Sequence, residues 1–274
     1  TKNDGDVSSM PKGLSIKNDP FIQQFDLAIS LYEMKNFEMY GYTLVNDTEA
    51  FDLCTSKYFS YLKMVKENIR TPKTVSITHS SEVEECVKRL GSKFPIVLKS
   101  STGTQTGVGV VIVESMRSLK ALVQMTLLYN KHLPLIIQEF VPIDYDIRVI
   151  VCEGQILGSM KREVISGDGR SNVSLGAEAS QIELTEMEKL EAIRIAEVFG
   201  TRLAGIDLLP ANNREKEKPY CLEVNSNPGF RGIEKYVGGV TKQFVNMFKD
   251  KSLWNQNNPE LNTEDTIIRE RWTL

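Results

Sequence analysis

The stretch from Cys221 to Gly229, which reads CLEVNSNPG, constrains this chain more than any other feature. Its apolar residues alternate with a carboxylate and an amide before a Pro-Gly break, as in a strand that ends in a turn. Because side chains alternate between the two faces of a strand, Glu223 and Asn225 should share one face. Leu222 and Val224 should then point into the core. Two oxygen donors at this spacing are half of a site for a hard cation, such as Mg²⁺ held against the phosphates of a nucleotide.

Asp207 lies in a second apolar segment, residues 204–209, and completes the predicted set of oxygen donors. The polar run at 211–218 between the two segments indicates a hairpin loop, which would bring Asp207 roughly opposite Glu223. The register of that pairing stays open at this level. So does the simpler interpretation, in which these are ordinary polar residues on the wet face of a hairpin. Both strands are otherwise apolar, which favours the metal site.

Composition narrows the range of functions. The chain has 274 residues, with 33 Lys and Arg against 36 Asp and Glu, so it lacks the basic footprint of a nucleic-acid-binding protein. Its four cysteines are scattered without a CxxC pair, which argues against a zinc site or a disulfide framework and favours a reducing compartment. Its two histidines lie far apart, so histidine-based catalysis is not expected. Without a long apolar segment or a signal peptide, we expect a cytoplasmic protein with no membrane and no nucleic-acid partner.

Hydrophobic periodicity and capping signals predict alternating helices and strands. Residues 1–30 should form a polar leader or the remnant of an N-terminal domain. Predicted helices lie at 20–42, 55–70, 81–90, 116–129, 185–199 and 242–249, and further strands at 73–78, 94–99, 108–113, 135–142, 144–151 and 158–162. Leu62 and Val65 belong to the apolar residues at helical spacing in the second helix. The expected caps are Thr55 or Ser56 for the second helix, Ser81 with Glu84 for the third, and Thr185 with Glu188 for the fifth.

A glycine-rich loop at residues 100–107, SSTGTQTG, separates the predicted strands at 94–99 and 108–113. Glycines let backbone N–H groups come close to phosphate oxygens, and Lys99 beside the loop could add a fixed positive charge. The loop matches neither the Rossmann GxGxxG motif nor the Walker GxxxxGK[ST] motif. Taken alone, a flexible hairpin tip beside a solvated lysine explains the same residues equally well.

Other candidate reactant-binding groups lie at the end of the strand at 135–142 and in the segments that follow it. The backbone at its end could bind an adenine edge while Phe140 packs on the ring, although a core strand with a polar end is the simpler interpretation of this segment alone. Arg148, Arg162 and Arg170 come from neighbouring segments. A single surface arginine is usually solvated, but a converging set beside a metal site favours an anionic reactant.

Seven motifs occur in the order seen in ATP-grasp ligases: FPIVLK at 94–99, GTQ at 103–105, QEF at 138–140, DIR at 146–148, RSN at 170–172, AGID at 204–207 and LEVNSNPG at 222–229. With GIEK at 232–235, the chain resembles the RimK-type glutamate ligases over residues 36–248. The resemblance implies an α+β fold of the ATP-grasp type, in which two α+β subdomains clasp ATP. These would span 31–140 and 141–250, with a tail at 251–274. The N-terminal α/β domain of the family would be truncated or reduced, and Thr106 is an extra residue in the glycine loop.

The resemblance also implies roles for the matched residues. The expected nucleotide-binding residues are Lys57, Lys99, Gly103, Thr104, Gln105, Gly107, Gly109, Glu139, Phe140, Asp146, Arg170, Ser171 and Asn172. The lysines and the glycine loop would hold the phosphates, Glu139 and Phe140 the adenine, Asp146 the ribose side, and Arg170 with Asn172 the transferred phosphate. The expected catalytic residues are Arg148, Arg162 and Arg170. Asp207, Glu223 and Asn225 would bind two Mg²⁺ ions, for which Mn²⁺ could substitute.

The implied activity is that of an ATP- and magnesium-dependent carboxylate–amine ligase, which forms an amide through an acyl phosphate. The donor amine would be glutamate, and the acceptor a carboxylate on a peptide, a protein C-terminus or a small acid; a homo-oligomer is compatible with this. Two alternatives stay open: an ATP-grasp ligase for another amino acid or acid, and a non-catalytic ATP-binding module. A protein kinase is disfavoured, because there the glycine loop precedes the lysine and HRD and DFG motifs follow.

Overall fold

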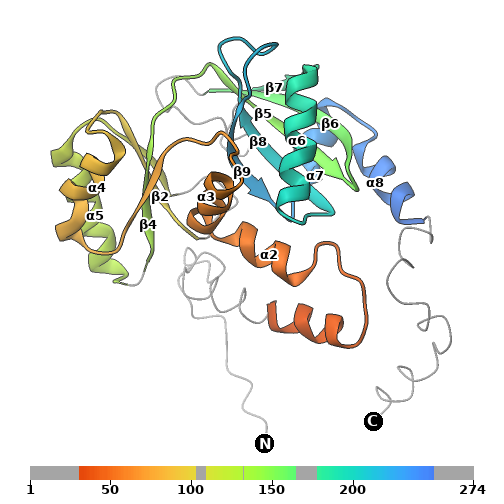
Figure 1. The fold of residues 1–274 in the computed structure, drawn as a ribbon, viewed down its shortest axis with the longest axis horizontal. Coiled ribbons are helices and arrows are strands. Elements are labelled where there is room, and N and C mark those ends of the chain that lie inside the picture. Colours follow the sequence, from red (N-terminus) through yellow and green to blue (C-terminus); the bar gives the residue numbers. More distant parts are fainter. Residues whose placement is uncertain (1–30, 103–108, 132, 165–177, 250–274) are drawn as a thin grey trace, which may run out of the picture.

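The computed structural model describes residues 31–102, 109–131, 133–164 and 178–249 (Figure 1). Two antiparallel sheets form its framework: a four-stranded sheet in the order β1-β4-β2-β3 and a five-stranded sheet in the order β7-β6-β5-β8-β9. In Figure 1 the four-stranded sheet lies on the left, and the five-stranded sheet with its helices lies on the right. The chain passes from one sheet to the other at residues 140–144, called the crossing segment below. Each sheet packs with its own helices, so the described part of the chain forms two α+β units.

The four-stranded sheet is covered by two helices. Its strands are β1 (Thr74–Ile77), β2 (Ile96–Ser100), β3 (Val110–Val113) and β4 (Leu135–Glu139), and the helices are α4 (Val83–Leu90) and α5 (Met116–Tyr129). The helix predicted at 116–129 is confirmed. Leu119 and Val123 of α5 are fully buried, in one apolar cluster with residues of α4 and of all four strands. The periodic apolar stripe of each helix therefore seals one face of this sheet.

The capping box predicted for α4 is wrong. A short 3₁₀ turn, η3 (Ser80–Glu82), precedes the helix, and the Glu82 carboxylate accepts hydrogen bonds from the backbone N–H groups of Thr78 at 3.2 Å and His79 at 3.3 Å. Glu84 instead pairs with Lys120 of α5. The helix does end at Leu90 as expected, and Gly91 adopts a left-handed backbone conformation there.

The five-stranded sheet has helices on both faces. Its strands are β5 (Tyr145–Cys152), β6 (Gln155–Glu163), β7 (Ala179–Gln181), β8 (Leu203–Leu209) and β9 (Tyr220–Asn225). Its helices are α6 (Glu186–Val198), α7 (Phe230–Tyr236) and α8 (Val240–Lys249). Val149 and Val151 pack with residues of α6, whereas Ile150 packs with Ile233 of α7 and Val240 of α8. β5 is thus buried on both faces, as its continuous apolar run requires.

The helix pair α2 (Thr48–Thr55) and α3 (Lys57–Lys66) precedes both sheets in sequence and reaches both. Ser56 caps α3, as predicted, by accepting a hydrogen bond from the Phe59 backbone N–H at 3.3 Å. The buried side of this helix differs from the expected one. Met64 lies in the core of the five-stranded sheet, while Leu62 and Val65 are about half exposed. α3 also holds Lys57 at its first position, where it faces the junction of the two sheets.

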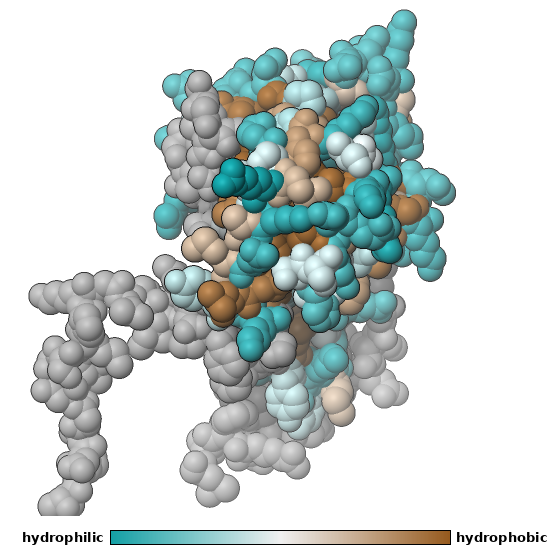
Figure 2. Space-filling view, turned by 90° about the vertical axis from the view of Figure 1, so that its left-hand side faces the viewer, coloured by the Kyte–Doolittle hydropathy of each residue, from teal (hydrophilic) through white to brown (hydrophobic). Residues whose placement is uncertain are grey.

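Figure 2 shows the side of the molecule that carries α4 and α5. Hydrophilic residues cover most of this face, and hydrophobic side chains show between them. The exposed hydrophobic residues of α5 are Met125, Leu128 and Tyr129. None of the helices in the described ranges is long and apolar enough to span a membrane.

Candidate active site

A cleft of about 610 Å³ lies between the two sheets and contains most of the predicted site residues that the structure describes. Strands β2, β3 and β4 line one side, and strands β5, β6, β8 and β9 with helix α7 line the other. Lys57 of α3 and three residues of the crossing segment, Phe140, Val141 and Ile143, complete it. A cleft between two sheets joined by a short connection suits a ligand held from both sides.

The pairing of β8 with β9 confirms that the hairpin brings Asp207 opposite Glu223. Asp207 lies directly opposite Glu223, and Asn225 lies opposite Gly205 two pairs further along. The register shifts just after this point, so that Leu208 pairs with Cys221. The resulting irregularity displaces the residue between Cys221 and Glu223 from the regular alternation of faces.

Leu222 is that displaced residue, and the prediction that it points into the core is wrong. It is partly exposed and lines the cleft, beside Glu223. Cys221 takes the core position instead and packs in the same apolar cluster as Val224. The strand therefore presents an apolar side chain and a carboxylate side by side on its cleft face.

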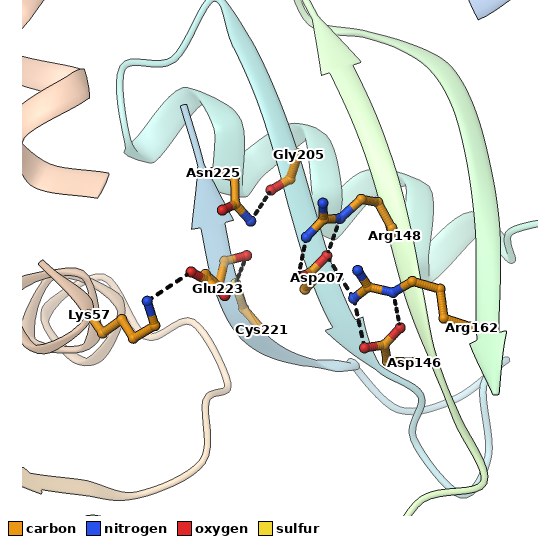
Figure 3. A network of polar contacts seen from close by, with 9 residues as sticks. All are labelled: Lys57, Asp146, Arg148, Arg162, Gly205, Asp207, Cys221, Glu223 and Asn225. Carbon is orange, nitrogen blue, oxygen red and sulfur yellow. Dashed lines mark hydrogen bonds and ion pairs between the residues drawn. The ribbon is translucent and has the colours of Figure 1, made fainter. Parts of the chain in front are cut away.

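Asp207 is the most tightly held of the three predicted metal ligands (Figure 3). Arg148 donates to its carboxylate through Nε to Oδ1 and through Nη2 to Oδ2, both at 2.6 Å, and Nη2 of Arg162 lies 3.1 Å from Oδ1. Burial alone would raise the pKa of Asp207, but the two guanidinium groups outweigh it and hold the pKa at about 2. The carboxylate is therefore ionised over the whole physiological range, as a metal ligand must be.

Arg162 is itself held by a second carboxylate. It donates through Nε and Nη2 to the two oxygens of Asp146, at 2.6 and 2.7 Å, and both side chains are almost fully buried. Burial lowers the pKa of Arg162, but the charges of Asp207 and Asp146 raise it further than burial lowers it. Arg162 thus bridges two acids from neighbouring strands, Asp146 of β5 and Asp207 of β8, and this network fixes the position of Asp207.

The other two predicted metal ligands, Glu223 and Asn225, are held by fewer contacts than Asp207. Glu223 lies 3.2 Å from Nζ of Lys57, with side chains about a third and a fifth exposed. The backbone N–H of Lys57 donates to the carbonyl of Ser101 at 2.8 Å, which joins the start of α3 to the start of the glycine-rich loop. Asn225 donates through Nδ2 to the carbonyl of Gly205 at 3.4 Å (Figure 3). These groups can exchange their present partners for a ligand more easily than Asp207 can.

Lys99 reaches the cleft from β2 as a buried cation. Its Nζ donates to Oε1 of Gln138 at 2.7 Å, and Nε2 of Gln138 donates to Oγ1 of Thr74 at 2.8 Å. Burial lowers the pKa of Lys99 to about 8, although the nearby Glu223 carboxylate opposes this. The lysine lacks a carboxylate partner within hydrogen-bond distance in the part of the chain that the structure describes, so an anion in the cleft would restore its ordinary pKa. The role of Gln138 was missed from the sequence, although it is a polar residue inside an apolar strand.

The donor set fits a magnesium ion that shares its ligands with a substrate. Within the described ranges, no group of three or more His, Cys, Asp or Glu side chains could hold a metal ion by itself. Asp207, Glu223 and Asn225 supply oxygen atoms from two carboxylates and one amide. Mg²⁺ commonly takes one or two carboxylates and completes its shell with water and phosphate oxygens.

The remaining predicted residues fall into two groups. Glu139, Phe140 and Asp146 line the cleft. Gly109, with a φ of 92°, comes directly before β3. The others lie outside the described residues: Gly103, Thr104, Gln105, Thr106, Gly107, Arg170, Ser171 and Asn172. The individual functional roles of all these residues stay predictions.

Comparisons with known proteins agree with this geometry. The model of the RimK-like ATP-grasp domain matches residues 54–247. A protein of Marinomonas sp. named probable alpha-L-glutamate ligase is 31% identical over 227 residues, which is 81% of this chain and 73% of the relative. A protein of Vibrio atlanticus with the same name is 30% identical over 239 residues, 85% of this chain and 77% of the relative.

Two solved structures share the fold. The RimK domain ATP-grasp protein of Sphaerobacter thermophilus superimposes with a TM-score of 0.59 at 19% identity, over 74% of this chain and 70% of that one. D-alanine–D-alanine ligase from Bacillus anthracis, in complex with ATP, superimposes with a TM-score of 0.59 at 17% identity, over 78% of this chain and 68% of that one.

Proposed function

Because this chain belongs to the RimK-like ATP-grasp family and is an ATP-dependent carboxylate–amine ligase, we propose that it adds glutamate to the C-terminal carboxylate of a peptide or protein. The names of the relatives from Marinomonas and Vibrio atlanticus support glutamate as the donor amine. The charge of the cleft supports anionic reactants, since six Lys or Arg side chains line it against four Asp or Glu.

One observation carries the proposal. Asp207 and Glu223 lie opposite each other on adjacent strands, with Asn225 nearby on the same strand as Glu223, and cations from five different elements line the same cleft. An oxygen-donor set flanked by lysines and arginines is the arrangement that phosphoryl transfer needs. Bound Mg²⁺ would offset the negative charge of the phosphates during transfer. We propose two such ions, with Mn²⁺ able to replace them.

ATP would lie along the junction of the two sheets. Lys57 and Lys99 line a small pocket together with Glu223, where they would hold the phosphates beside the metal-binding trio. The adenine would lie against Glu139 and Phe140, at the start of the crossing segment. Lys99 is buried and has no carboxylate partner within hydrogen-bond distance among the described residues, so it is available to bind phosphate.

The reaction would proceed in two transfers. An oxygen of the acceptor carboxylate attacks the γ-phosphorus, the bond from that phosphorus to the β-bridging oxygen breaks, and ADP leaves with the electron pair. The amine nitrogen of glutamate then attacks the carbonyl carbon of the acyl phosphate. The C–N bond forms, the C–O bond to phosphate breaks, phosphate leaves with that pair, and the amine loses a proton to solvent. Arg148 and Arg162 would stabilise the negative charge near Asp207 throughout.

Release of ADP tests this function directly. The protein is incubated with ATP and Mg²⁺, each of the common amino acids, and peptides with either a free or an amidated C-terminus. We expect release that needs both glutamate and a free carboxylate, with a peptide product heavier by one glutamyl residue. Glu223→Gln should abolish release, while Glu186→Gln, which removes an exposed acid of α6 outside the cleft, should not.

A different pattern would refute the proposal. Equal release with the amidated peptide would exclude a C-terminal acceptor. Release that depends on another amino acid would retain the ligase and reject glutamate. Binding of a non-hydrolysable ATP analogue without release under any of these conditions would favour a nucleotide-binding module.

A further inference from the structure

The strand pairings arrange the floor of the cleft in rows that lead from the crossing segment towards α7. β5 begins directly after the crossing segment, so its Asp146 forms the row nearest that segment. The next row contains Asp207 and Glu223, and the row beyond it contains Gly205 and Asn225. If the adenine lies at the crossing segment, the phosphates lie over the middle row and a reactant lies beyond Asn225.

Helix α7 lies at that far end. The Pro228 ring packs directly on Gly205, since a Cβ added to this glycine would lie 2.7 Å from Cβ of the proline. α7 begins two residues later, and Ile233 holds it against β6. Arg231 and Lys235 are four residues apart on this helix, so they share one of its faces, and both line the cleft.

Arg231 differs from the other cleft-lining cations in having no assigned partner. Arg148, Arg162 and Lys57 form ion pairs with acids of the cleft, and Lys99 donates to Gln138. Within the described part of the chain, Arg231 forms no hydrogen bond and no ion pair. Arg231 is exposed to solvent, but its side chain lines the same cleft as the metal-binding trio.

Lys235 adds a second positive charge beside it. Its Nζ lies 3.2 Å from the hydroxyl of Tyr236 and 4.8 Å from the centre of that ring, and it has no acidic partner within the described residues. The far end of the cleft therefore carries two cations without a counter-charge from the described residues. A guanidinium group binds a carboxylate through two parallel hydrogen bonds, which an uncharged amide cannot match.

We propose that Arg231, assisted by Lys235, binds the side-chain carboxylate of the amino acid that enters at the α7 end and so determines the preference for an acidic donor. This inference rests on the proposed ligase function and names a subsite within it. It assigns specificity to α7, whereas the residues of the β-strands serve the nucleotide and the metal.

Steady-state kinetics of Arg231→Gln test the subsite, with Lys242→Gln as the matched control. Lys242 is an exposed lysine of the adjacent helix α8 and does not line the cleft. We expect Arg231→Gln to raise the KM for glutamate by about tenfold to a hundredfold, the range for losing a charged hydrogen bond. The KM for ATP should stay within about twofold, and the preference for glutamate over glutamine should collapse. Arg231→Lys should restore part of it.

Other outcomes would refute either the Arg231 subsite or the proposed ligase function. If Arg231→Gln behaves as Lys242→Gln does, or raises the KM for ATP as much as that for glutamate, the subsite is wrong. A wild-type enzyme that uses neutral but not acidic amino acids refutes the subsite and leaves the ligase intact. If no amino acid is turned over, the proposed function fails, and thermal unfolding with Mg²⁺ and a non-hydrolysable ATP analogue decides the subsite. Stabilisation by glutamate that Arg231→Gln abolishes supports it, and no effect of glutamate refutes it.

Discussion

Replacing Asp207 by Asn separates the structural role of this carboxylate from its proposed role as a metal ligand. A buried acid that only awaits a metal ion would destabilise the free protein, so removing its charge would be stabilising. Here two guanidinium groups hold the carboxylate, and its pKa is about 2 instead of the usual 3.8. That shift corresponds to about 2 kcal/mol of stability at neutral pH. Removing one partner of a buried ion pair costs about 3–5 kcal/mol. The cost should be somewhat smaller here, because Arg162 keeps Asp146 as a partner.

We therefore expect Asp207→Asn to lower the free energy of unfolding by about 2–4 kcal/mol, measured by urea denaturation without nucleotide or metal. Glu223→Gln is the matched control, because its partly exposed pair with Lys57 should contribute less than about 1 kcal/mol. Both variants should lose ligase activity, so only stability distinguishes them.

The pH dependence of this difference has a defined sign. The folded-state pKa of Asp207 lies below the unfolded value, so its contribution is complete above pH 3.8 and is lost as the pH falls through about 2. The stability gap between wild type and Asp207→Asn should thus be constant near neutrality and shrink below pH 3.8. An Asp207→Asn protein as stable as the wild type at neutral pH would refute the view that the arginines outweigh the burial of this charge.

Three further predictions follow from the geometry. Because burial lowers the pKa of Lys99 to about 8, binding of a magnesium-loaded, non-hydrolysable ATP analogue should weaken as the pH rises through that value, and calorimetry on Lys99→Gln should show weak binding without this titration. Gly205→Ala places a Cβ 2.7 Å from Pro228 and should cost about 1–3 kcal/mol with loss of activity; Gly232→Ala, whose nearest contact would be 3.5 Å, should be tolerated in thermal unfolding. Asn46→Ala removes four hydrogen bonds to backbone at the start of β8 and just after β9, three of them buried and one partly buried. It should lower the unfolding free energy by about 2–4 kcal/mol in urea, and an unchanged midpoint would exclude that anchoring role.

Local signals predicted the elements well where a single pattern dominates. The capping box of Thr185 and Glu188 forms as expected, because both reciprocal hydrogen bonds lie within one turn of chain. The same kind of motif failed at Ser81 and Glu84. There the Glu82 carboxylate accepts the hydrogen bonds of the turn, and Glu84 forms an ion pair with Lys120 of α5. The second contact exists only because α4 and α5 pack side by side.

Long-range effects decided the rest. The sequence around α3 shows several apolar residues at helical spacing, but which of them are buried depends on the sheet against which the helix docks. Met64 packs against the five-stranded sheet, and Val65 is about half exposed. Leu222 shows the same limit in a strand, because the irregular pairing of β8 with β9 reverses its expected face.

By itself, the sequence identified residues that the structure brings together in one cleft. It placed Asp207, Glu223 and Asn225 on neighbouring strands, because the period of two along a strand and a polar connecting loop are local properties. Only the tertiary structure decided how the charges combine: that Arg148 and Arg162 hold Asp207, that Gln138 holds Lys99, and that Arg231 has no partner in the described residues. Such pairings join segments far apart in the chain, and their energies depend on burial, which no local pattern encodes.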